Sequence, residues 1–94
     1  MTFNELQRRV EEYDKEFGWQ GDKPEHTALH MQEEMGEISR EILKLSDYGK
    51  GEYDGGRIND EINDMLYLTL KLGNLLGLDL DEGWARIRER YGGK

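Results

Sequence analysis

Apolar side chains recur at intervals of three and four residues along much of the chain, which is the spacing of one face of an α-helix. The clearest run lies within residues 24–45, where Pro24 suits the first turn of a helix because its missing N–H breaks no intrahelical hydrogen bond. The apolar positions of this run are Ala28, Met31, Met35, Ile38, Ile42 and Leu45. The pattern predicts a long helix with this stripe facing the core.

Capping signals predict helices at both ends of the chain. Thr2 with Glu5 three positions later is the capping-box pattern of a helix start, and Gly18 marks the expected end of that helix. Its apolar side should comprise Phe3, Leu6, Val10 and Tyr13. Asp79 and Glu82 repeat the capping pattern, and they predict a last helix whose packing side chains are Leu80, Trp84, Ile87 and Tyr91.

A further helix is predicted over residues 57–76, where Gly77 should end it. From its middle onward this helix is apolar on nearly every side, at Met65, Leu66, Leu68, Leu70, Leu72, Leu75 and Leu76. Such a helix needs neighbours all round, and a chain this short has few to offer. We therefore expect part of its surface to be a subunit interface, and the alternative is the central helix of a monomeric bundle.

Glycines mark three further features. The polar, glycine-rich stretch 46–56 is typical of a mobile loop between two helices. Gly36 and Gly73 instead lie inside predicted helices, where glycine costs about 1 kcal/mol relative to alanine. We expect another helix to approach closely at both of these positions.

The predicted fold class is all-α, a four-helix bundle completed by oligomerisation. A single proline and an abundance of Leu, Glu, Lys and Arg favour helices over strands. The 94 residues correspond to one domain spanning residues 1–94. A chain of this length buries only about 60 to 65% of its unfolded surface, so association with further copies would help to stabilise it.

Composition excludes several classes of function. No cysteine is present, which excludes disulfides, zinc–thiolate sites and thiol nucleophiles. The formal charge of -8 argues against a grip on a nucleic-acid polymer, because that grip needs a positive surface. The first residues do not form a basic segment followed by an apolar run, and the apolar stretch 65–80 is interrupted by polar residues. We expect a cytoplasmic protein with no membrane partner.

Two groups of acidic residues stand at helical spacing beside the apolar stripes. The group on the second predicted helix is Glu33, Glu34, Glu37 and Glu41, and the group on the third is Asp60, Glu61 and Asp64. Each like-charge contact of this kind costs about 0.2 to 0.5 kcal/mol, so the arrangement indicates a neutralising cation. Ligation by oxygen alone suits Mg²⁺, with Mn²⁺ as a substitute, better than Zn²⁺.

The alternative interpretation of these acids is a solvated acidic face. The chain is rich in acid, and similar pairs occur at Glu11 with Asp14 and at Asp22 with Glu25. Arginines at helical spacing can also neutralise part of the charge. From the residues alone, a metal site and a solvated face both remain open, and convergence of the two acid pairs would favour the metal site.

The acidic motifs and their surroundings resemble the signature of MazG-like nucleotide pyrophosphohydrolases. Residues 33–37 read Glu-Glu-Met-Gly-Glu and residues 61–64 read Glu-Ile-Asn-Asp, which is similar to the Glu-Glu-x-x-Glu…Glu-x-x-Asp pattern of that family. Residues 30–32 and 75–80 extend the resemblance, which covers roughly 30–91. It implies an all-α fold, Mg²⁺ dependence, homodimers or homotetramers, and hydrolysis of nucleoside triphosphates to monophosphates and pyrophosphate.

The resemblance also implies roles for individual acids. Carried over by position, Glu34, Glu37, Glu61 and Asp64 are the implied metal ligands. Glu33 matches the first acid of the motif, and from one helical turn away from Glu37 it is placed to orient or deprotonate the attacking water. It is the candidate catalytic residue.

Candidate substrate contacts are less distinctive. Relatives often carry a Lys-x-Asn-x-Lys pattern near the C-terminus, where this chain has Arg86 and Arg90, so these arginines either bind phosphate or balance the helix dipole. His30 and Lys71 either contact substrate or make ordinary surface contacts. Trp19 either stacks on a base or packs at the edge of the bundle.

Three functions are compatible with the sequence. The first is the removal of damaged, deoxy or excess nucleoside triphosphates by a house-cleaning pyrophosphohydrolase. The second shares that chemistry but acts on phosphoribosyl-ATP, dUTP or dCTP. The third is a non-catalytic acidic helical oligomer that binds a protein partner or divalent ions.

Overall fold

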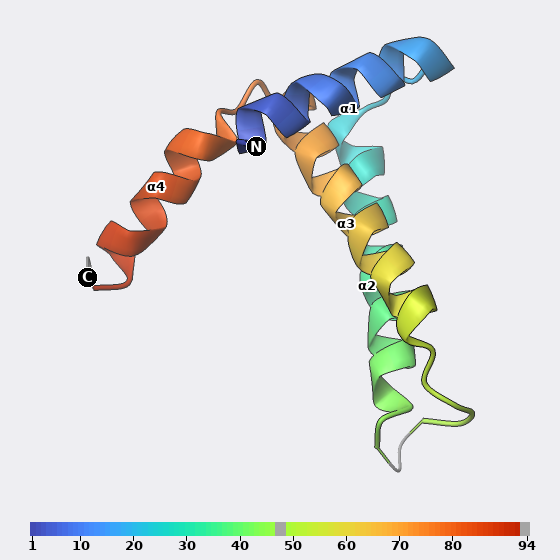
Figure 1. Ribbon diagram of the computed structural model, residues 1–94. Helices are drawn as coiled ribbons and strands as arrows, with labels where there is room; N and C mark the ends of the chain where they lie inside the picture. The colour runs from blue at the N-terminus through green and yellow to red at the C-terminus, as the bar shows by residue number, and fades with distance from the viewer. Residues whose placement is uncertain (47–48, 93–94) are drawn as a thin grey trace.

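The computed structural model describes residues 1–46 and 49–92, so the predicted loop 46–56 lies partly outside the described residues. Within this part of the chain every regular element is an α-helix, which confirms the all-α class (Figure 1). None of these helices combines the length and the apolar character needed to cross a bilayer. The helices are α1 (Phe3–Phe17), α2 (Pro24–Leu43), α3 (Gly55–Leu75) and α4 (Leu80–Arg90).

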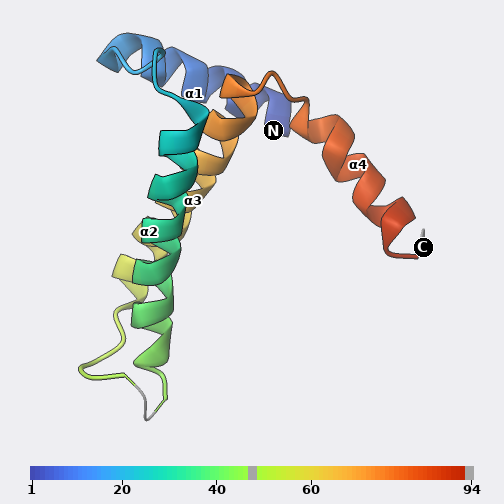
Figure 2. The same ribbon diagram turned by 180° about the vertical axis from the view of Figure 1, so that it is seen from behind.

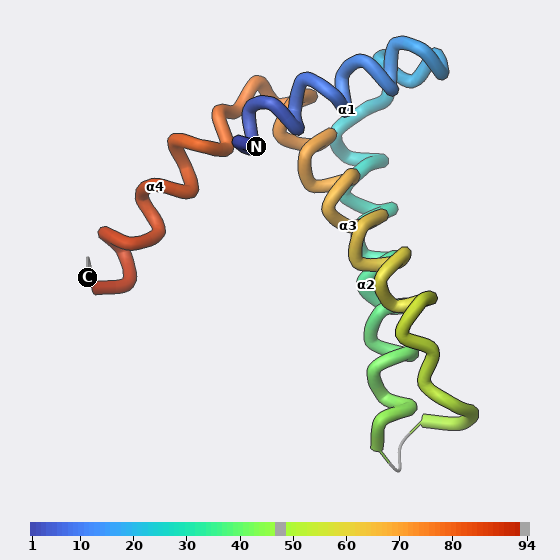
Figure 3. Tube along the Cα trace, in the orientation of Figure 1, coloured from blue at the N-terminus to red at the C-terminus, as the bar shows by residue number. Residues whose placement is uncertain are grey.

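Helices α2 and α3 run side by side in opposite directions and form the body of the molecule (Figures 1 and 2). Helix α1 crosses one end of this pair, and α4 leads away from the same end on the other side (Figure 3). The four helices therefore do not close into a bundle within one chain. The two helices that carry the acidic motifs are thus direct neighbours.

The predicted caps are in place. Thr2 and Glu5 form the complete capping box of α1, and Gly18 ends that helix with a φ of 77°, a conformation that favours glycine. Asp79 caps α4 by accepting a hydrogen bond from the backbone N–H of Glu82 at 3.0 Å. The starts of α1 and α4 are thus determined by local capping chemistry, as the sequence predicts.

Three helix boundaries differ from those predicted, one of them by a single residue, because α3 ends at Leu75. Helix α3 begins at Gly55, earlier than expected, because Asp54 caps it by accepting hydrogen bonds from the N–H groups of Gly56 and Arg57 at 3.0 and 3.1 Å. Helix α2 ends at Leu43, before the last apolar residue of its predicted stripe. Capping by the aspartate outweighs the low helix propensity of two successive glycines at the start of α3.

The buried face of α2 is narrower than the predicted stripe. Ile38 is buried and Met31 is half-buried, but the rest of the stripe is exposed, at Ala28, Met35, Ile42 and Leu45. Polar Thr27 and Glu41 are buried in its place. Helix α3 is the main neighbour of α2, and it covers only a narrow side of α2. Within the described residues the buried apolar core comprises Val10, Ile38, Ile58, Leu68 and Leu70.

The inner face of α1 also differs from the predicted one. Gln7 and Asp14 are buried beside Val10, whereas Tyr13 is 52% exposed. Gln7 Nε2 donates to the carbonyl of Leu78 at 2.9 Å, and Asn74 Nδ2 donates to the carbonyl of Gln7 at 2.8 Å. These hydrogen bonds satisfy the buried polar groups and fix α1 across the end of α3.

The two interior glycines behave differently. A Cβ added at Gly73 would lie 3.0 Å from Leu80 Cδ1 and 3.2 Å from Gln7 Nε2, so the predicted close approach is confirmed there. At Gly36 no atom lies within 4 Å of such a Cβ. The expectation of a close helix at Gly36 is therefore wrong for the contacts within one chain.

Helix α4 is anchored at its first turn. The carboxylate of Asp81 accepts hydrogen bonds from the N–H groups of Phe3 and Asn4 at 3.0 and 3.1 Å, which provides the start of α1 with a second acidic cap. The rings of Phe3 and Trp84 meet edge to face, with their centroids 5.3 Å apart. Beyond this contact none of the residues of α4 is fully buried.

Candidate functional site

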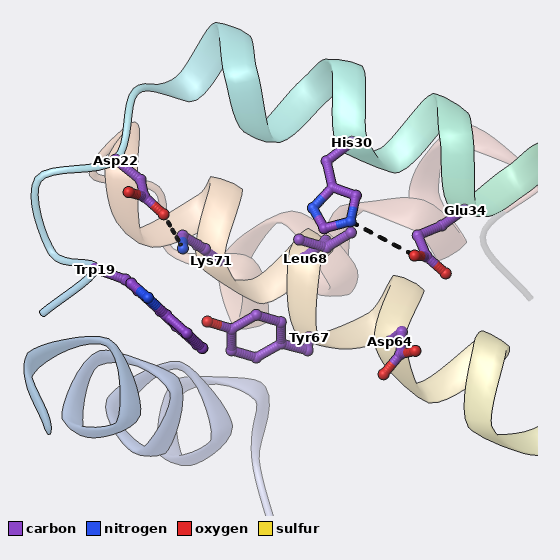
Figure 4. Close-up of a pocket in the computed structure, with 8 residues that line it drawn as sticks. All are labelled: Trp19, Asp22, His30, Glu34, Asp64, Tyr67, Leu68 and Lys71. Carbon is purple, nitrogen blue, oxygen red and sulfur yellow. Dashed lines mark hydrogen bonds and ion pairs between the residues drawn. The ribbon is translucent and has the colours of Figure 1, made fainter. Parts of the chain in front are cut away.

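A pocket of about 460 Å³ lies between α2 and α3, where the segment that follows α1 closes one end (Figure 4). One end is acidic and the other is aromatic and charged, as Figure 4 shows. The residues that line it are Trp19, Asp22, His30, Glu34, Asp64, Tyr67, Leu68 and Lys71. Five of the predicted site residues are among them.

The acidic end brings the two motifs together. Glu34 on α2 and Asp64 on α3 both face the pocket (Figure 4). Burial raises the pKa of Glu34, and the negative charges of Glu37, Asp64 and Glu61 raise it further. His30 opposes this effect, with its Nε2 3.5 Å from Glu34 Oε1. Glu34 thus lies close enough to the other three predicted ligands for their charges to raise its pKa.

Two carboxylate oxygens at this end are buried without a partner. They are Oε2 of Glu34 on α2 and Oε2 of Glu61 on α3, and neither accepts a hydrogen bond within the described part of the chain. The other oxygen of Glu61 accepts from Nε of Arg57 at 3.2 Å. A buried charged oxygen left unsatisfied costs free energy, so each motif has one acceptor that a hard cation would fit.

The carboxylates do not form a closed ligand set as placed. Among residues 1–46 and 49–92, no three acidic or histidine side chains converge closely enough to hold a metal ion. The donor chemistry fits Mg²⁺, since every predicted ligand atom is a carboxylate oxygen. Ligation by both motifs would require their side chains to rotate toward a common point.

Glu41, which lies near this site on α2, has a structural role. Glu41 is 2% exposed and accepts hydrogen bonds from the backbone N–H of Asp54 at 3.0 Å and from Lys44 Nζ at 3.1 Å. The Asp54 N–H lowers the pKa of Glu41, and the Lys44 ammonium adds to the effect. Arg57 Nε lies 3.8 Å away. Glu41 therefore ties the start of α3 to the last turns of α2.

The opposite end of the pocket is organised around a buried lysine. Lys71 is 5% exposed, and its Nζ lies 2.6 Å from Asp22 Oδ2 and 3.7 Å from Asp14 Oδ1. Tyr67 donates its hydroxyl hydrogen bond to Asp14. Burial and this hydrogen bond raise the pKa of Tyr67, so the phenol stays protonated. Lys71 thus faces the pocket with its charge balanced by two carboxylates.

Trp19 forms an aromatic wall at the same end. Its ring stacks on Phe17 with centroids 5.0 Å apart and an interplanar angle of 30°, and Lys71 Nζ lies 5.5 Å from the ring centroid. The sequence pattern does not distinguish Asp14 and Asp22 from the other acids of the chain, so their place here was not predicted. The available signal was the lysine in an apolar helix, because a buried ammonium requires an acidic partner.

Five predicted residues lie apart from the lining of this pocket, namely Glu33, Glu37, Glu61, Arg86 and Arg90. Glu33 is exposed on α2. Arg86 pairs with Glu82 at 3.0 Å on the surface of α4, and the guanidinium of Arg90 lies 5.6 Å from the Tyr91 ring centroid. Because α4 leads away from α2 and α3, one chain does not bring these arginines to the acidic end (Figure 1).

Comparison with known proteins adds the family. The sequence model described as phosphoribosyl-ATP pyrophosphohydrolase matches residues 3–91. The chain is also 28% identical over 94 residues to the uncharacterized protein YpjD of Bacillus subtilis (strain 168), covering 96% of this chain and 83% of that protein. No solved structure matches it. The chain belongs to the phosphoribosyl-ATP pyrophosphohydrolase family, within the MazG-like all-α superfamily that its acidic motifs resemble.

Proposed function

We propose that the protein is a Mg²⁺-dependent pyrophosphohydrolase of nucleoside triphosphates, which releases a nucleoside monophosphate and pyrophosphate and removes damaged or excess nucleotides. The family supports a pyrophosphohydrolase activity, and its members generally depend on a divalent metal. The observation that carries the proposal is the pair of buried, unpartnered oxygens of Glu34 and Glu61, which belong to facing helices. A solvated acidic face would leave such oxygens in water.

In this proposal Glu34, Glu37, Glu61 and Asp64 hold the cation. When bound there, a cation would supply positive charge that neutralises phosphate oxygens and makes a nearby water molecule more acidic. Glu33, which is exposed one turn before Glu37, takes the proton of the attacking water. Water adds to phosphorus, the α–β anhydride bond breaks, and pyrophosphate leaves.

The rest of the pocket would hold the nucleoside. His30 positions Glu34 through their 3.5 Å contact, since imidazole and carboxylate lie one turn apart on α2. Trp19 offers a ring face to the base, and Lys71 lies at the same end of the pocket. Arg86 and Arg90 would meet phosphate only if a second subunit brought α4 to the site.

We also propose that the working form is a homodimer or homotetramer. A groove of about 440 Å³ separates α3 from α4, with apolar walls that include Leu66, Leu70, Trp84 and Ile87. Leu66 is 41% exposed and Trp84 is 61% exposed, and such large apolar surfaces are typical of interfaces. A second copy is the proposed occupant, because the chain alone leaves α4 without buried residues.

A second candidate substrate is phosphoribosyl-ATP, which the description of the matched family names. It shares the same bond cleavage, and the assay that separates it is a direct comparison with nucleoside triphosphates. dUTP and dCTP belong in the same comparison. The non-catalytic alternative, an acidic oligomer that binds a protein partner or divalent ions, predicts that none of these substrates releases pyrophosphate.

The test is release of pyrophosphate by purified protein from a panel of nucleotides, with Mg²⁺ and with a chelator. We expect Mg²⁺-dependent release, which Asp64→Ala abolishes while the helical circular dichroism spectrum is kept. Glu12→Gln on the exposed face of α1 is the matched control and should retain activity. Absence of release from every nucleotide and from phosphoribosyl-ATP would overturn the proposal.

A further inference from the structure

The aromatic and charged end of the pocket lies at a suitable distance to receive the base of a nucleotide whose phosphate is bound at the acidic end. This inference rests on the proposed pyrophosphohydrolase function. Asp64 and Lys71 are seven residues apart on α3, which corresponds to about 10 Å along the helix axis at 1.5 Å per residue. This separation is comparable with the extent of a nucleotide from its phosphate to its base. A phosphate among the carboxylates would place the base beside Trp19, Asp22 and Lys71 (Figure 4).

Asp22 and Lys71 form a fixed pattern of hydrogen-bonding groups at that end. Their ion pair is 2.6 Å long, and Oδ1 of the buried Asp14 lies 3.7 Å from Lys71 Nζ. The side chain of Asp22 is 48% exposed, and within the described residues its Oδ1 accepts no hydrogen bond. Because each carboxylate oxygen can accept more than one hydrogen bond, Oδ2 keeps acceptor capacity beside Lys71. The edge presented to a ligand is therefore one ammonium donor beside two carboxylate acceptors.

The hydrogen-bonding edge of guanine complements this pattern. Guanine presents O6 as an acceptor, followed by N1–H and the 2-amino group as two adjacent donors. Adenine and cytosine place a single amino donor beside an acceptor nitrogen, so the second carboxylate oxygen would face a lone pair. Uracil and thymine place their one N–H between two carbonyl oxygens, with the same conflict. Among the common bases, guanine alone satisfies both oxygens and the ammonium.

The aromatic wall favours a flat ring at this place. Trp19 is 45% exposed, and Phe17 packs against its ring, which fixes the orientation of the wall. A base stacked on Trp19 would turn its edge toward the neighbouring Asp22 and Lys71 (Figure 4). We propose that this end of the pocket selects guanine nucleotides, with Asp22 accepting from N1–H and the 2-amino group and Lys71 donating to O6.

Two measurements on the full chain test this selection. The first is kcat/KM for GTP, ITP, ATP, CTP and UTP with Mg²⁺, and the second is calorimetric binding of the corresponding monophosphates, which needs no turnover. ITP lacks the 2-amino group, so we expect it to fall about tenfold or more below GTP, the usual effect of losing a hydrogen bond to a charged group. ATP, CTP and UTP should fall further.

Asp22→Asn replaces one acceptor by a donor and should lower the GTP to ATP ratio of kcat/KM about tenfold or more. Glu25→Gln is the matched control. It also removes one negative charge, three residues along the chain, at an exposed position outside the pocket, and it should leave the ratio unchanged. If Asp22→Asn reduced all nucleotides equally, Asp22 would have only a structural role and the inference would be wrong.

The two proposals fail separately. Hydrolysis of all nucleotides without a preference for guanine would overturn the guanine site and leave the pyrophosphohydrolase standing. Tighter binding of GMP than of IMP and AMP, lost in Asp22→Asn, would support the guanine site even if no nucleotide were hydrolysed. Neither binding nor hydrolysis of any nucleotide would overturn both.

Discussion

Replacement of Glu34 by glutamine should change the stability of the protein in opposite directions without and with Mg²⁺. The carboxyl group is 13% exposed, and its pKa is raised by burial and by three neighbouring carboxylates. A carboxyl group whose pKa is higher in the folded state binds more protons there than in the unfolded chain. Its contribution to stability therefore falls as the pH rises from the unfolded pKa of 4.5 through the folded value. At neutral pH without metal, ionised Glu34 opposes folding.

The magnitude comes from the contacts of this carboxylate. Repulsions from Glu37, Asp64 and Glu61, at about 0.2 to 0.5 kcal/mol each, sum to roughly 1 kcal/mol. Without metal, Glu34→Gln should therefore raise the free energy of unfolding by about 1 kcal/mol and Tm by about 5 °C for a chain of this size. Saturating Mg²⁺, at a hundred times its Kd, should stabilise the wild type by about 2.7 kcal/mol and the variant much less.

The assay is thermal unfolding followed by circular dichroism at one protein concentration, at pH 7.5, with chelator and with Mg²⁺. The variant should melt higher than the wild type in chelator and lower in saturating Mg²⁺. Glu12→Gln, which removes an exposed charge from α1, should show no such reversal. If Glu34→Gln destabilised the protein equally under both conditions, the carboxylate would be an ordinary structural group and its proposed role as a metal ligand would be wrong.

Four further substitutions test the packing and the proposed interface. Lys71→Met leaves the buried Asp14 without its cation, so it should lower the free energy of unfolding, measured by urea titration, by about 3 kcal/mol. A loss below about 1 kcal/mol would contradict the buried ion pair. Gly73→Ala should lower the free energy of unfolding by about 1 to 3 kcal/mol, because the added Cβ would press on Leu80. Gly36→Ala should raise it by up to about 1 kcal/mol, because nothing lies near that position. Equal effects of the two substitutions in the same titrations would contradict the packing. Trp84→Glu should shift the mass measured by light scattering toward the monomer, and an unchanged mass would remove the groove from the proposed interface.

The helices and their caps were predictable because their signals are local. Thr2 with Glu5, Gly18, and Asp79 act on backbone groups within a few residues, so spacing alone identifies them. The buried faces were less predictable, because they depend on which neighbour covers a helix. Ile42 belongs to a regular apolar stripe yet is 46% exposed, since α3 covers a different side of α2.

The candidate site also has one end that the sequence predicts and one end that it does not. Glu34 and Asp64 were identified because motif spacing places each pair on one face of its own helix, and antiparallel pairing then brings the pairs together. The other end depends on contacts between distant parts of the chain. Lys71 meets Asp22 across 49 positions of sequence, and no local pattern encodes that contact.

Whether one cation joins the two acid-bearing helices can be measured by binding of Mn²⁺, with the free ion quantified by electron paramagnetic resonance. Wild type should be compared with Glu34→Gln on α2, with Asp64→Asn on α3 and with the double variant. A cation shared by both helices predicts weaker binding in each single variant and a loss in the double variant that is smaller than the sum. Binding of Mn²⁺ that is unchanged by either substitution would contradict a metal site between the helices.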